Sequence, residues 1–137
     1  MTPEQKTLVQ DSFELVEPIA ADAAKLFYGN LFAMDPALQS IFKGDMEEQG
    51  KKLMQMIGTA VRMLDRLDEL VPVVQRLGVR HVEYGVQTTH YDTVGAALLK
   101  TLRQGLVTAE VETAWTVVYG VLSSTMINAA YPAQADV

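Results

Sequence analysis

Apolar side chains recur every three or four residues along almost the whole chain, which is the spacing of one face of an α-helix. Strands would instead alternate apolar and polar residues between turn residues, and the sequence contains no convincing segment of that kind. The pattern therefore predicts an all-α fold. The chain has 137 residues, of which 49% are hydrophobic, and this is enough for one helical domain with a single core. We expect one domain over residues 1–137, with a core from about residue 2 to residue 131 and a frayed tail at 132–137.

Capping residues and prolines divide this pattern into helices. Thr2 and Gln5 form a capping-box pair before the first helix, which is expected to end near Val16. The second helix is expected to open at Pro18, with Ile19 on its apolar face, and to stop before Asp35-Pro36. A short turn over 36–42 follows. Further helices are expected after the N-cap Asp45, after residues 65–68 with Pro72 in the first turn, near His90 up to Gly105, and from Thr108 to about Tyr131.

Charge and composition exclude several classes of function. The net charge of −6, with no cluster of basic residues, argues against binding to nucleic acid or to an anionic membrane. The absence of cysteine excludes disulfides, zinc-thiolate sites, iron–sulfur ligation and a cysteine nucleophile. Residues 113–135 carry no charge and are long enough to cross a bilayer, but polar residues interrupt them, so we expect a helix of a soluble domain without a membrane span. The N-terminus has no signal-peptide features, which predicts a cytoplasmic protein.

His81 is the most informative polar residue, because it lies in an apolar stripe four residues after Leu77. A buried imidazole either satisfies its hydrogen bonds within the core or binds a ligand, and one histidine is enough for one axial position of haem iron. His90, the other histidine, precedes the apolar stripe of its helix and is expected at an exposed helix start. The pattern alone favours a core role for His81 and leaves the ligand role open.

A polar amide and two small residues suggest where helices cross. Gln49 falls where the apolar stripe of Leu53 would extend back by one turn, so it either faces a ligand or lies in a solvated first turn. Ala24 and Gly50 are expected at a close helix crossing that brings Tyr28 near Gln49. No paired acids, nucleophile elbow, P-loop or dinucleotide fingerprint is present, so hydrolase, kinase and dehydrogenase functions have no support.

Several segments together resemble a known family in their order and spacing. They are LFYGNLF at 26–32, DP at 35–36, IF at 41–42, Gln49, RHVEYGV at 80–86, HY at 90–91, AW at 114–115 and YGV at 119–121. The chain resembles bacterial single-domain globins, and it is similar to the globin domain of flavohaemoglobins and to Vitreoscilla-type haemoglobin over about residues 2–131. The resemblance implies a globin fold, a 3-over-3 helical sandwich around haem b.

The resemblance also implies residue roles. It makes His81 the proximal ligand of the haem iron and Phe42 the aromatic that packs on the porphyrin. It sets Tyr28 and Gln49 over the sixth coordination position, where a hydroxyl and an amide can donate hydrogen bonds to dioxygen. The remaining pocket positions that it implies are Leu53, Leu77, Val86, Tyr91, Val94 and Leu98.

Three functions follow from the resemblance. The first is reversible binding of O2 for storage, delivery or transport, with NO and CO as further ligands. The second is an enzyme, a nitric oxide dioxygenase that converts NO and O2 to nitrate and draws electrons from a separate flavin reductase. A gas or redox sensor ranks lower. The glutamate that the family carries late in its last helix is Ala130 here, so we expect weak peroxidase activity at most. Both a monomer and a homodimer are compatible with the sequence.

Overall fold

The computed structural model describes residues 1–42, 44–105 and 108–131, and all regular elements within these residues are helical. The all-α prediction is therefore confirmed. The elements are α1 (Pro3–Val16), η1 (Glu17–Ile19), α2 (Ala20–Met34), η2 (Pro36–Ile41), α3 (Met46–Arg62), α4 (Leu67–Glu83), α5 (Thr88–Gln104) and α6 (Ala109–Ala130). Among the described residues, no helix combines the length and apolar character that crossing a membrane would require.

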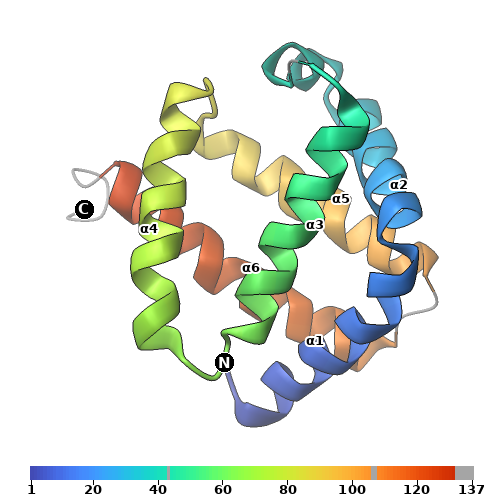
Figure 1. Ribbon diagram of the computed structural model, residues 1–137, viewed down its shortest axis with the longest axis vertical. Coiled ribbons are helices and arrows are strands. Elements are labelled where there is room, and N and C mark those ends of the chain that lie inside the picture. Colours follow the sequence, from blue (N-terminus) through green and yellow to red (C-terminus); the bar gives the residue numbers. More distant parts are fainter. Residues whose placement is uncertain (43, 106–107, 132–137) are drawn as a thin grey trace.

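The helices cross in layers (Figure 1). Helices α3 and α4 lie in front of α5 and α6, and α2 runs along one side of the molecule. The long helix α6 packs against α1, α4 and α5, whereas α2 packs against α3 and α5. Helix α3 packs against α1 and α2, and α4 packs against α6, whereas α3 and α4 have few direct contacts with each other.

The predicted helix ends are formed largely by the expected caps. The Thr2 side chain accepts from the Gln5 N–H while the Gln5 side chain accepts from the Thr2 N–H, which completes the capping box of α1. Asp45 accepts from the Glu47 N–H at 2.9 Å and caps α3. Thr108 caps α6, and Gly105 ends α5. The helix boundaries that depend on local hydrogen bonds are therefore confirmed.

Two boundary predictions are wrong. Pro18 does not open α2, because Glu17–Ile19 form a 3₁₀ turn with three residues per turn. The side chains of this turn therefore do not continue the apolar face of the α-helix that follows it. Ile19 is consequently 56% exposed and does not lie on the buried face. Pro72 is not in the first turn of α4 but inside the helix, because α4 begins earlier, at Leu67. Burial of Leu70, with 1% of its surface exposed, accounts for this early start.

The buried side chains form two clusters. The first joins α1, α4, α5 and α6 with the end of α3, and it includes Trp115, whose indole N–H donates to the Ser12 hydroxyl at 2.8 Å. The second joins α2, η2, α3 and α5 around Phe27, Tyr28 and Leu31. Asn30 ties α2 to α5, because its amide donates to the side chains of Thr101 and Gln104. Leu98 of α5 packs against both clusters and so connects them.

Candidate functional site

Most of the candidate residues on α2, α3 and α5 gather in the second cluster. Tyr28, Phe42, Leu53, Val94 and Leu98 all belong to it. The rings of Tyr28 and Phe42 meet edge to face, with their centroids 5.2 Å apart. The structure therefore brings these five residues together, although they come from three helices and from the residue that follows η2.

Gln49 joins this group through Tyr28. The Tyr28 hydroxyl donates a hydrogen bond to the backbone carbonyl of Gln49 at 3.3 Å. The small residues act as predicted, because a Cβ on Gly50 would lie 3.1 Å from the Ala24 Cβ, so α2 and α3 cross closely there. Burial raises the pKa of Tyr28 to about 12, and the hydroxyl therefore keeps its proton at neutral pH.

His81 is oriented by its own helix. Its Nδ1 lies 2.7 Å from the Leu77 carbonyl oxygen, and a carbonyl can only accept, so Nδ1 is the protonated nitrogen. Within the described residues, Nε2 makes no hydrogen bond. Burial lowers the pKa of His81, and the hydrogen bond to Leu77 opposes this only in part. The result is a neutral imidazole with a free lone pair on Nε2, the form that binds metal ions.

Tyr91 and Val86 complete the surroundings of His81. The Tyr91 ring is stacked on the imidazole, with centroids 6.4 Å apart and an interplanar angle of 28°. The Val86 N–H donates to the His81 carbonyl at 3.0 Å. Tyr91, Val94 and Leu98 follow one another at helical spacing on α5, so a single helix face connects the His81 group with the Tyr28 group.

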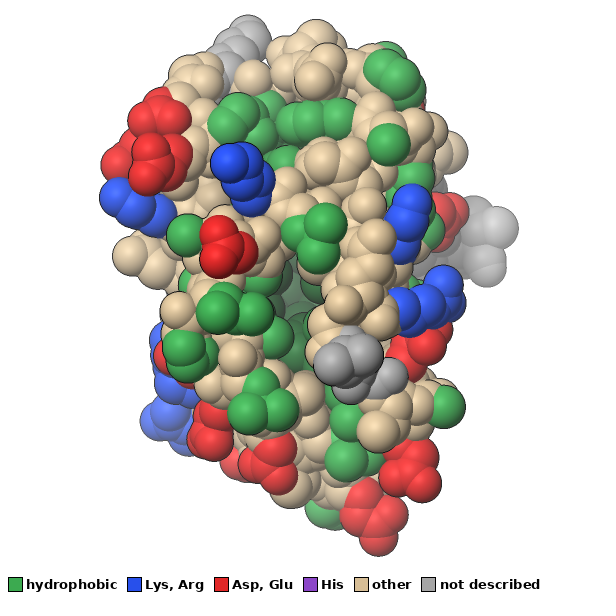
Figure 2. Space-filling view, turned by 90° about the vertical axis from the view of Figure 1, so that its right-hand side faces the viewer, with side chains coloured by type: hydrophobic (Ala, Val, Ile, Leu, Met, Phe, Trp, Pro, Cys, Tyr) green, Lys and Arg blue, Asp and Glu red, His purple; other side chains and the backbone are tan. Residues whose placement is uncertain are grey.

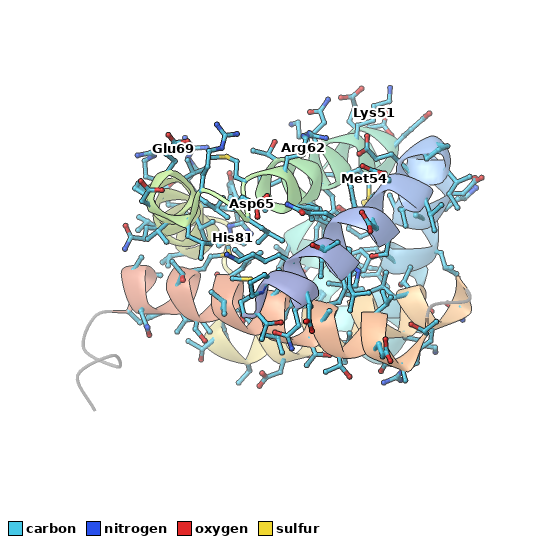
Figure 3. All side chains as sticks on the ribbon, turned by 90° about the horizontal axis from the view of Figure 1, so that it is seen from below. Lys51, Met54, Arg62, Asp65, Glu69 and His81 are labelled. Carbon is cyan, nitrogen blue, oxygen red and sulfur yellow. The ribbon has the colours of Figure 1, made fainter. Side chains whose placement is uncertain are left out.

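None of the candidate residues lines either of two surface depressions of the described chain. Figure 3 shows His81 on the inner side of α4, towards α6, whereas Lys51, Arg62 and Glu69 project outward. Figure 2 shows hydrophobic side chains around a hollow on the α2 side of the molecule. The surface depressions at α2 and between α4 and α6 are lined by other residues: Asp22, Lys25, Leu26, Gly29 and Asn30 at the first, and Gln75, Arg76, Val79, Arg80 and Ala129 at the second.

The residues present fit a haem group. A neutral histidine with a free Nε2 is the donor that haem iron needs. Leu53, Leu77, Val94 and Leu98 are only half-buried, so their apolar side chains still have surface with which to cover a large flat ligand. The chemistry of the donor and of its apolar surroundings is therefore compatible with a porphyrin.

Four residues near the site were missed by the sequence analysis. Gly85, with φ of +89°, lies in the turn after α4. A glycine just past an apolar helical stripe predicts a helix end, so the sequence could have indicated this position. Gly78 lies where a Cβ would fall 2.7 Å from the Met126 Cα, so α4 and α6 touch there. The Tyr119 hydroxyl donates to the Tyr91 carbonyl at 2.6 Å, and the Tyr131 hydroxyl donates to the Val86 carbonyl at 3.1 Å. No local sequence pattern predicts the contacts of Gly78, Tyr119 and Tyr131, because each joins segments that are far apart in the chain.

The chain is similar to proteins of one family. A flavohemoprotein of Vibrio cholerae is 29% identical over 134 residues, which cover 93% of this chain and 34% of that protein. The chain therefore spans about a third of the length of the curated relatives that it matches. A bacterial globin from Campylobacter jejuni has a solved structure with a TM-score of 0.84 and 27% identity, and the match covers 98% of this chain and 99% of that one.

A second solved structure is an engineered carbene transferase from Rhodothermus marinus, with a TM-score of 0.86 and 22% identity over 99% of this chain and 97% of that one. Its likeness supports the fold. The sequence model of the globin family matches residues 25–126. The predicted globin fold is confirmed, and the chain belongs to the globin family.

Proposed function

We propose that this protein binds haem b through His81 Nε2 and reversibly binds dioxygen. The observation that carries the proposal is the state of His81: its Nδ1 proton is donated to Leu77, and its Nε2 lone pair is free. When bound, haem would supply an iron centre that takes up a diatomic gas, with NO and CO as further ligands.

The chain's own residues would determine how the gas is held. Phe42, Leu53, Val94 and Leu98 would cover the porphyrin and exclude water, while Leu77, Val86 and Tyr91 would enclose the proximal side. The Tyr28 hydroxyl, which keeps its proton because its pKa is about 12, is available as a hydrogen-bond donor. Its bond to the Gln49 carbonyl is long, at 3.3 Å, so the hydroxyl can exchange this acceptor for a better one at small cost.

A nitric oxide dioxygenase is the second candidate function, which the resemblance to the globin domain of flavohaemoglobins suggests. In this proposal the globin domain would receive its electrons from a flavin reductase. Sustained consumption of NO over many turnovers with an added reductase and nicotinamide cofactor would favour the enzyme. A single turnover followed by arrest would favour the oxygen carrier. In both cases we propose a single cytoplasmic domain, as a monomer or a homodimer.

The first experiment compares absorption spectra of the parent, His81→Ala and His90→Ala after haem reconstitution, in ferric, reduced and reduced-then-aerated states. His90 is the matched control, because its Nδ1 accepts from the Gln87 N–H at the start of α5 and it lies outside the proposed site. The expected result is a Soret band and a stable oxygenated spectrum in the parent and in His90→Ala, with both features lost or disrupted in His81→Ala. A parent protein without a Soret band would refute haem binding.

The second experiment tests the distal donor. Tyr28→Phe removes the hydroxyl and keeps the ring contact with Phe42, whereas Tyr84→Phe removes an exposed hydroxyl as a control. Loss of a hydrogen bond of about 1 kcal/mol corresponds to roughly fivefold faster O2 dissociation in Tyr28→Phe. Equal dissociation rates in parent and Tyr28→Phe, measured by stopped flow, would show that this hydroxyl does not hold the gas.

A further inference from the structure

The turn that follows His81 is a compact hydrogen-bonded cap. The Gly85 N–H donates to the Val82 carbonyl and the Val86 N–H donates to the His81 carbonyl, both at 3.0 Å. This is the pattern of a Schellman motif, and Gly85 supplies the positive φ of +89° that it requires. The backbone of His81 is therefore one end of the cap, and Val86 is the other.

Helix α6 holds this cap from outside. The Tyr131 hydroxyl donates to the Val86 carbonyl at 3.1 Å, so Val86 joins Tyr131 on one side to His81 on the other. Tyr131 is itself fixed at the end of α6, because its N–H donates to the Ile127 carbonyl at 2.8 Å. A continuous path of hydrogen bonds thus runs from α6 to the His81 backbone.

A second tyrosine of α6 reaches the ring stacked on His81. The Tyr119 hydroxyl donates to the Tyr91 carbonyl at 2.6 Å. The Tyr119 ring fits against Gly95, where an added Cβ would lie 2.8 Å from a ring carbon, so the ring has little freedom to move. The Tyr91 ring is stacked on the imidazole, so the hydrogen bond from Tyr119 limits how far this ring can move away from one face of the His81 ring.

We propose that Tyr131 and Tyr119 are positioning residues that hold the His81 imidazole in a fixed orientation from α6. Tyr131 acts on the backbone of His81 through Val86, and Tyr119 acts on the ring through Tyr91. The inference rests on the proposed role of His81 as haem ligand. Groups that orient a metal-ligating histidine typically contribute about 10–100-fold to metal affinity or activity. The two tyrosines would accordingly set the strength and uniformity of the bond that His81 makes.

The test compares parent, Tyr131→Phe and Tyr119→Phe after haem reconstitution. Tyr84→Phe is the matched control, because the Tyr84 ring also lies near the imidazole, at 5.6 Å between centroids, but its side chain is 56% exposed and its hydroxyl makes no hydrogen bond within the described residues. The readouts are the iron–histidine stretching band in resonance Raman spectra of the ferrous protein without gas, and the rate of haem transfer to excess apomyoglobin. Hydrogen exchange of the Val86 amide in the haem-free chain is a third readout.

We expect a shifted or broadened stretching band and about tenfold faster haem loss in Tyr131→Phe and Tyr119→Phe, with parent behaviour in Tyr84→Phe. Exchange of the Val86 amide is expected to quicken in Tyr131→Phe alone. Stretching bands and haem loss identical to the parent in both variants would overturn the inference. Changes of equal size in Tyr84→Phe would also overturn it, because they would show a general effect of losing a nearby hydroxyl. Failure of the proposed function is distinguishable, since the parent itself would then lack the haem spectrum.

Discussion

The contact between α4 and α6 at Gly78 allows a sharp prediction. A Cβ placed on Gly78 would lie 2.7 Å from the Met126 Cα and 2.8 Å from its carbonyl carbon. Ordinary contact between carbon atoms begins at about 3.5 Å, so the overlap is close to 1 Å. Because the opposing atoms belong to the backbone, no side chain can rotate away, and Gly78→Ala must push the two helices apart.

The size of the effect follows from two opposing contributions. Alanine is favoured over glycine inside a helix by about 1 kcal/mol. Overpacking costs about 1–3 kcal/mol, and a backbone contact belongs at the upper end of that range. We therefore expect Gly78→Ala to lower the free energy of unfolding by about 2 kcal/mol. With an m-value of about 2 kcal/mol/M, the midpoint of urea unfolding should fall by roughly 1 M.

Gly120→Ala is the matched control, since Gly120 lies in α6 and an added Cβ would meet no atom within 4 Å. This variant should be more stable than the parent by about 1 kcal/mol. The assay is urea unfolding followed by circular dichroism for parent and both variants. If Gly78→Ala were as stable as Gly120→Ala, the close approach of α4 to α6 would be refuted.

Three further predictions follow from other contacts. Ser12→Ala should lower the free energy of unfolding by about 1–3 kcal/mol, because it leaves the indole N–H of the buried Trp115 without its acceptor; chemical denaturation showing less than 0.5 kcal/mol would contradict this. The pKa of His81 is lowered in the folded chain, so the unfolded chain binds the extra proton first and the free energy of unfolding should fall as pH drops below about 6.5. His81→Gln should lose less stability than the parent between pH 7 and pH 5. Equal losses of stability in thermal melts of the two proteins would show that the His81 pKa is not lowered by folding. Ala130→Glu should increase peroxide turnover by the haem-reconstituted protein, since the family resemblance implies that a carboxylate at this position raises the donor strength of the proposed haem ligand His81; unchanged guaiacol oxidation would count against this.

The sequence was most informative about local structure. Capping residues such as Thr2, Asp45 and Thr108 bond to atoms within three residues of themselves, so their effect does not depend on the rest of the fold. The prediction that Ile19 lies on the buried face of α2 was wrong because a 3₁₀ turn joins α1 to α2 there. Apolar spacing alone does not reveal such a change in the number of residues per turn. The same limit applies to the start of α4, which burial of Leu70 moves ahead of Pro72.

In the candidate site, too, the sequence predicts the local features, whereas the contacts between helices depend on packing. The sequence alone determined the helical class and the positions of most helix ends, since these depend on spacing and residue type. The resemblance of its motifs to one family identified His81 as the residue to test. The sequence also predicted that Tyr28 lies near Gln49, but only the tertiary structure decided that the Tyr28 hydroxyl donates to the Gln49 backbone carbonyl, and that Tyr131 reaches Val86 across 45 residues of chain. Such contacts arise from the angles and distances at which whole helices pack, and those depend on all the side chains of the core together.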